Sequence, residues 1–147
     1  MDERVRIGGA EQLTAIFGYW PSFHDAEVLW IKLDRQPYIV RYGPTLEALI
    51  HTHEMTSEVD SAGFYVLRNH VLVHMRFEGV DQLHLEGFNH QNALGELALT
   101  DLRDRQMEWI RWEVKFASSW GVGASFQCYS VEVVSVKPCN KDGEPIA

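Results

Sequence analysis

The stretch WPSFHDAEVLWIKL, residues 20–33, contains the change of period that predicts how this chain folds. Before it, residues 10–17 place apolar side chains at helical spacing, and Gly18 followed by Pro21 supplies a stop signal. Within it, residues 27–33 alternate with period two, as a half-buried strand does. The stretch therefore predicts a junction where a short N-terminal helix ends and the first strand begins.

The rest of the chain is dominated by strand signals. Further strands, a polar loop and a hairpin are predicted, and the apolar phase of the last strand slips, which indicates a β-bulge or burial on both faces. The predicted segments are strands at 46–53, 97–100, 110–116 and 126–136, a loop at 54–63, and a hairpin at 71–88 that turns at 78–81. We expect an α+β fold that is mostly β, with one short helix on a mostly antiparallel sheet of about six or seven strands.

The predicted hairpin also makes a register prediction for polar residues on its outer face. If the turn centres near Val80, His74 lies opposite Glu86 and Arg76 lies opposite His84. Cross-strand pairs of this kind suit the solvated side of a sheet.

Length and composition indicate one compact domain. The 147 residues are 46% hydrophobic and 12% aromatic, enough for a core of its own. We expect a single domain over residues 1–147, ending in a polar tail over 138–147. The charged start MDERVRIGGAEQ lacks the apolar run of a signal peptide, and we expect a cytoplasmic protein without a membrane segment.

The charge balance constrains the partner. Thirteen Lys and Arg against 21 Asp and Glu give a net charge of −8. Such a field repels phosphates, which argues against nucleic-acid binding, and it attracts a basic protein partner. Simple solubility explains the same charge without any partner. The two cysteines predict neither a disulfide nor a zinc site, with Cys128 in the core and Cys139 in the tail.

Two arrangements of residues invite a chemical interpretation. His51 and His53 stand two apart on a predicted strand and share a face, so with His24 and Asp25 they would make a small metal-dependent enzyme. Two histidines beside a polar loop also occur by chance, and solvent-exposed side chains are the favoured interpretation. No cofactor is predicted.

His24 next to Asp25 is the other arrangement, since it resembles an acid–base pair. Adjacent residues of an extended chain point to opposite sides, and no nucleophile motif accompanies the pair. The favoured interpretation is structural: Trp20 and Phe23 pack on the core, while His24 and Asp25 bond to backbone groups at the junction. We therefore predict no catalytic residues and no enzyme.

Several strings, taken in order, resemble one protein family. Residues 17–28, FGYWPSFHDAEV, resemble the start of the immunity protein 50 family of bacterial polymorphic toxin systems. HMRFEGV at 74–80 is similar to its F-x-G-V element, and LEGFNHQN at 85–92 to its L-x-G-F-N-x-Q-N element. Residues 121–128 resemble its closing strand. The residues that match these motifs are Trp20, Pro21, Phe23, His24, Asp25, Glu27, Gly79, Gly87, Phe88, Asn89 and Asn92.

The resemblance implies a function that composition does not. Such proteins bind the toxin domain encoded beside them and protect the producing cell. The family offers no established catalytic residues to assign to this chain. The resemblance therefore implies that the motif residues are structural or contact the partner, and that the partner is a toxin domain, with a basic nuclease as one fitting type. An orphan relative with a changed partner is the remaining alternative. Exposed strand edges are compatible with a homodimer.

Overall fold

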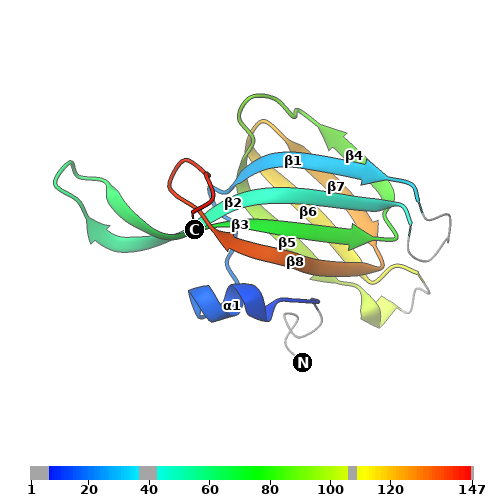
Figure 1. The fold of residues 1–147 in the computed structure, drawn as a ribbon. Helices are drawn as coiled ribbons and strands as arrows, with labels where there is room; N and C mark the ends of the chain where they lie inside the picture. The colour runs from blue at the N-terminus through cyan, green and yellow to red at the C-terminus, as the bar shows by residue number, and fades with distance from the viewer. Residues whose placement is uncertain (1–6, 37–42, 106–108, 147) are drawn as a thin grey trace.

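The computed structural model describes residues 7–36, 43–105 and 109–146, and the start of the chain, residues 1–6, lies outside that range (Figure 1). Within the described residues there are one α-helix, one 3-10 turn and eight strands. They are α1 (Glu11–Phe17), β1 (Glu27–Asp34), β2 (Thr45–Val59), β3 (Tyr65–Glu78), β4 (Asp81–Glu86), β5 (Ala93–Asp101), η2 (Arg103–Arg105), β6 (Trp112–Trp120), β7 (Gly123–Cys128) and β8 (Ser130–Pro138). The fold class is confirmed, with slightly more strands than predicted.

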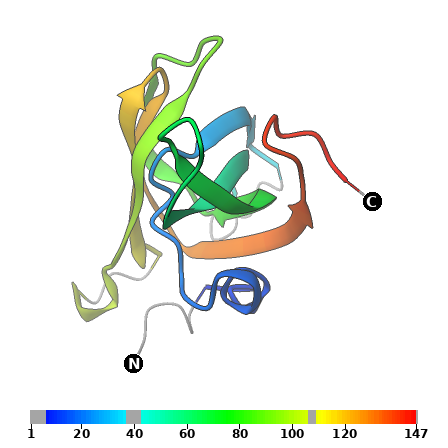
Figure 2. The same ribbon diagram turned by 90° about the vertical axis from the view of Figure 1, so that its left-hand side faces the viewer.

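The strands form one antiparallel sheet in the order β4-β7-β6-β5-β1-β2-β3-β8. It folds over on itself, so that β1, β2, β3 and β8 lie across from β4, β5, β6 and β7 (Figures 1 and 2). β1 and β5, where the layers join, pair only between Glu27 and Ala93. Backbone hydrogen bonds from the segment before β1 continue this seam, with the Leu94 amide donating to the Ala26 carbonyl at 2.8 Å and the Leu97 amide to the Ser22 carbonyl at 3.1 Å.

At the other corner of the sheet, two long strands bend and run from one layer into the other. β3 continues into β4 through Gly79 and Val80, while β7 continues into β8 through Tyr129. β3 pairs with β8 and β4 pairs with β7, and the Tyr129 amide donates to the Glu78 carbonyl at 2.8 Å. The two bent strands thus stay paired around the corner.

This corner shows that the predicted 71–88 hairpin is wrong. His74 lies opposite Leu49 and Ser135, not Glu86, and His84 lies opposite Ser125. A bend within a strand and the turn of a hairpin need the same kinds of residue, and Gly79 at φ 70° suits both. The local pattern therefore could not distinguish them.

The core lies between the two layers. One side comes from the inward residues of β2 and β3, and the other from the inward residues of β6 and β7. At its centre the rings of Phe77, Phe116 and Phe126 meet with centroids 5.1–6.2 Å apart. Cys128 is buried in the same core as predicted, and burial raises the pKa of its thiol to about 12.

Helix α1 covers the free edge of β8. Leu13 and Phe17 are its buried face, and Gly18 ends it in the left-handed region at φ 81°. Just before the helix, Gly8 forms a parallel bridge with Glu132 of β8, and the Gln12 side chain donates to the Val133 carbonyl at 3.0 Å. Backbone groups that β8 would expose at this edge are therefore satisfied.

The strand bounds settle two further predictions. The predicted loop at 54–63 is wrong for residues 54–59, because β2 runs on to Val59 and pairs with β3 beyond the body of the sheet, and it holds for the turn at 60–63. The predicted phase slip in 126–136 has two causes: the bend at Tyr129, and a bulge where His74 and Met75 face Ser135 and Val133. None of the described helices is long and apolar enough to span a membrane.

Candidate protein-binding surface

The first motif builds the junction that the sequence predicted. Phe23 is 1% exposed, and the Trp20 ring packs on it with centroids 5.9 Å apart. Phe23 and Asp25 both have φ 63°, a left-handed backbone conformation that residues other than glycine rarely adopt. The strained turn aims the Asp25 amide at the Leu94 carbonyl at 2.8 Å, so this segment continues the β1–β5 seam.

His24 and Asp25 lie on the surface of this junction. The His24 Nδ1 is 3.0 Å from the Gly95 carbonyl oxygen, and its Nε2 is 3.5 Å from the Asp25 Oδ2. We expected the two side chains to diverge, but the left-handed turn at Asp25 brings them together. Both side chains are about half exposed or more, and the ring hydrogen bonds to backbone as expected of a structural residue.

The LEGFNHQN motif at 85–92 interlocks with the first motif through Asn92, which is 3% exposed. Its Oδ1 accepts hydrogen bonds from the amides of Asn89 and Val122 at 2.9 and 3.1 Å, and its Nδ2 donates to the Asn89 and Val28 carbonyls. The Glu27 carboxylate accepts from the Asn92 amide. One buried amide side chain thus joins β1, the loop before β5 and the β6–β7 turn.

Two glycines make this joint possible. Gly87 sits at φ 75°, and a Cβ there would lie 2.6 Å from the Gly121 carbonyl oxygen. Gly121 sits at φ 82°, and a Cβ there would lie 2.1 Å from the Gln91 carbonyl oxygen. Backbone therefore approaches backbone more closely than any side chain allows. Phe88, by contrast, projects from the loop and is 49% exposed.

The two histidines of β2 belong to a cluster whose third member, on β3, the sequence did not predict. His51 and His53 share a face of β2, and His70 of β3 completes the group, with the His51 Nε2 3.0 Å from the His70 Nδ1. They are half-buried rather than solvent-exposed. Burial lowers the pKa of all three, and the neighbouring imidazoles lower those of His51 and His53 further.

The tail predicted at 138–147 packs beside this cluster over its described residues. Cys139 is buried, its amide donates to the His70 carbonyl at 3.0 Å, and it bridges back to Pro145. The Asn140 Oδ1 holds the turn between them by accepting from the Asp142 and Glu144 amides at 2.9 Å each. Gly143 at the tip faces the His51 ring. This turn is one reason why the histidines are half-buried.

The alternative of a metal site built from His24, Asp25, His51 and His53 finds no support among the described residues. Across the residues with described placement, no group of three or more His, Cys, Asp or Glu side chains is arranged to hold a metal ion. The charges of Asp25 and His24 act on the pKa of His53, but the ring contacts of His53 are with His51 and His70.

Five exposed apolar side chains occur on a hairpin that we name the arm, residues 54–68. The arm is the part of β2 and β3 that extends beyond the sheet (Figure 1). Met55 pairs with Leu67 and Val59 pairs with Tyr65, and all four side chains are exposed. Phe64, in the turn of the arm, is 71% exposed.

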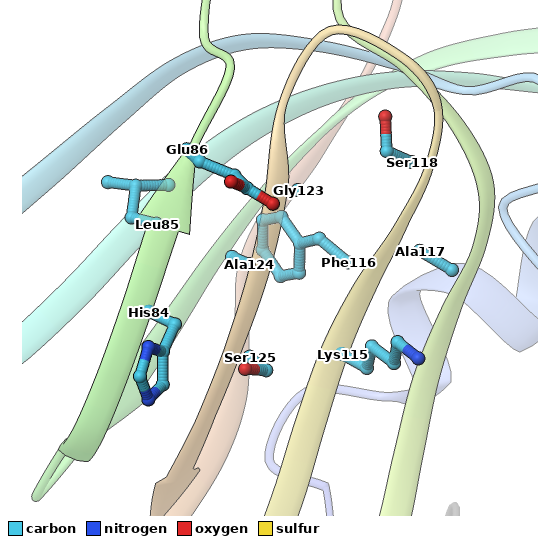
Figure 3. Close-up of a pocket in the computed structure, with 10 residues that line it drawn as sticks. All are labelled: His84, Leu85, Glu86, Lys115, Phe116, Ala117, Ser118, Gly123, Ala124 and Ser125. Atoms are coloured by element: carbon cyan, nitrogen blue, oxygen red, sulfur yellow. The ribbon is translucent and has the colours of Figure 1, made fainter.

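A second surface feature is a hollow on the outer face of β4, β7 and β6, with a volume of about 360 Å³ (Figure 3). His84 and Lys115 flank Ser125 from the two neighbouring strands, and Gly123 leaves space above the backbone. Because the predicted hairpin paired His84 with β3, the pattern did not indicate that His84, Ser125 and Lys115 are neighbours across β4, β7 and β6. Its size fits a side chain or a short loop of a partner.

Comparison with known proteins assigns the chain to a family. The sequence model of immunity protein 50 matches residues 9–139, which takes in both interlocked motifs, the arm and β8. Neither the curated proteins nor the solved structures gave a significant match. Because the match spans nearly the whole described fold, the chain belongs to the immunity protein 50 family.

Proposed function

We propose that this protein binds the toxin domain of a bacterial toxin and neutralises it without catalysis. The observation that carries this proposal is the family match over residues 9–139. An immunity protein acts on a toxin made by the same cell or a sibling, so the cytoplasm is the compartment in which we propose it works.

The surface supports a binding role. The exposed apolar residues of the arm offer the kind of side chain that anchors protein interfaces. The net charge of −8 favours a basic partner and would accelerate its association. A toxin that acts on nucleic acid has such a surface, since it must bind phosphates.

The test uses the toxin encoded by the neighbouring gene. Co-expression of this protein should restore growth to cells that produce the toxin, and the two purified chains should form a stable complex. Failure of both rescue and binding would contradict the proposal.

Stoichiometry separates binding from catalysis. Toxin activity should fall linearly and reach zero near one equivalent of this protein, and toxin recovered from the complex by denaturation and refolding should be active. Complete inactivation by a small fraction of an equivalent would indicate an enzyme that modifies the toxin. Naked toxin taken through the same refolding is the control.

A further inference from the structure

We infer that the arm, residues 54–68, is the element that enters the toxin, and that it fits an apolar groove bordered by Lys and Arg. The inference rests on the proposed function and names the surface and the partner chemistry for it. The argument starts from the two faces of the arm.

One face of the arm is apolar and carries no covering element among the described residues. Residues paired across two strands share a face, and side chains two apart on a strand do so as well. Leu67 and Tyr65 stand two apart on β3 and share a face with their partners Met55 and Val59, although β2 holds two extra residues between these pairs. These four apolar side chains are exposed, as is Phe64 in the adjoining turn, and exposed apolar groups of this kind mark interaction sites.

The other face and the turn hold the arm in shape. Thr56 donates from its hydroxyl to the Val66 carbonyl at 2.7 Å, and the Asp60 carboxylate accepts from the Ala62 and Phe64 amides at 2.9 and 3.0 Å. An isolated two-stranded hairpin is only marginally stable in water. These local bonds make the arm a preformed element, which lowers the entropy lost on binding.

The base of the arm is tied to the body. The Glu54 carboxylate accepts from the Tyr19 hydroxyl at 3.0 Å and from the Asn69 side chain at 3.1 Å. Tyr19 follows α1, so the arm is braced against the helical side of the molecule. A braced, projecting hairpin is convex, and its complement on the partner is concave.

The charge of the arm indicates which kind of partner surface it fits. Glu54, Glu58 and Asp60 are acidic, and the one basic residue, Arg68, pairs with Glu58 at 2.5 Å. A second copy of this chain would bring these acids together, and an anionic membrane would repel them. A groove with a basic border is attracted instead.

The first experiment compares two pairs of exposed aromatic residues. The double variant Phe64→Ala with Tyr65→Ala shortens the arm's aromatic tip, and Trp109→Ala with Trp120→Ala removes exposed aromatics from the segment before β6 and from the end of that strand. Binding to catalytically disabled toxin domain is measured by calorimetry. The arm variant should bind about 100-fold more weakly and the control variant within about threefold of wild type.

The second experiment tests the charge of the groove at one exposed position of the turn, Ser61. Ser61→Lys should slow association with the toxin domain several-fold, and Ser61→Glu should accelerate it, with the difference disappearing at about 1 M salt. Equal association rates for the two variants would overturn the basic border.

The outcomes separate the inference from the function on which it rests. Wild-type protein that does not bind the toxin overturns both. Wild-type binding with an arm variant that binds equally well overturns the inference and leaves the function standing. A concentration-dependent dimer that the arm variant abolishes, seen by light scattering, would assign the arm to a second copy and overturn it too. Urea unfolding of each variant confirms that the fold is intact.

Discussion

The joint between the two sequence motifs and the arm are opposite in construction. In the joint, Asn92 is buried and each polar atom of its side chain is bonded, while glycines let backbone approach backbone. The arm leaves its large apolar side chains in water and contains none of the residues that match the family motifs. The difference teaches that a buried, bonded residue such as Asn92 contributes to the fold, whereas the exposed side chains of the arm are accessible to a partner.

The largest contrast should come from phenylalanine truncation in each region. Phe23→Ala in the junction keeps the same strained backbone but empties a buried site, and it should lower the free energy of unfolding by about 3–5 kcal/mol. Phe64→Ala in the arm should change it by less than about 0.5 kcal/mol. Urea denaturation measures both. Equal effects would mean that the arm is packed in solution.

The hydrogen-bond hub should give the next largest effect. Asn92→Ala leaves two amides without an acceptor, that of Val122 in the β6–β7 turn and that of Asn89 in the loop before β5. The free energy of unfolding should fall by about 3 kcal/mol. Asn140→Ala is the matched control, since that side chain also accepts from two amides but in an exposed turn. Water can replace its bonds, so the loss should stay below about 1 kcal/mol. A similar loss for both would show that the hub is not shielded from water.

Two glycines of positive φ sharpen the comparison further. Gly63→Ala in the arm meets no atom within 4 Å and should cost about 1 kcal/mol, from the left-handed backbone alone. Gly87→Ala pays the same backbone strain and also meets the Gly121 carbonyl oxygen, so it should cost about 1–2 kcal/mol more. Thermal denaturation compares them. A loss at Gly87 no greater than at Gly63 would contradict the close backbone contact.

The smallest effect concerns pH and the histidine cluster at the base of the arm. Burial holds the pKa of His51, His53 and His70 below the ordinary value of 6.5, so the unfolded chain binds protons more readily in mildly acidic solution. Stability should be retained above pH 6.5 and should decrease as the pH falls below it toward the lowered pKa values. Replacing the three by Gln should flatten this dependence between pH 7.5 and 5.5 in urea titrations. An unchanged slope would place its origin outside the cluster.

The sequence predicted the elements whose signal is local. The apolar periods of residues 10–17 and 27–33 identified α1 and β1, because a buried face repeats with the geometry of its own element. The arm was missed because its strands are exposed on both faces and show no such repeat. Its polar residues therefore read as a loop.

What depends on long-range pairing was not predictable. Nothing near Glu27 indicates that its carboxylate meets the Asn92 amide, and nothing near His53 indicates that His70 stands beside it. The bend at Gly79 was read as a reversal because only the pairing partner, β7 rather than β3, distinguishes the two. The family resemblance supplied what the residue pattern alone could not, namely the class of protein.

The bridge between Gly8 and Glu132 also has a consequence for timing. The segment at the start of the fold rests on the last strand, so α1 has no place to dock until β8 has left the ribosome. At ordinary rates of synthesis that interval is on the order of 10 s, and sheets closed by distant segments then fold slowly. A chain that is still being made therefore leaves the β8 edge uncovered, and the complete fold exists only after synthesis has ended.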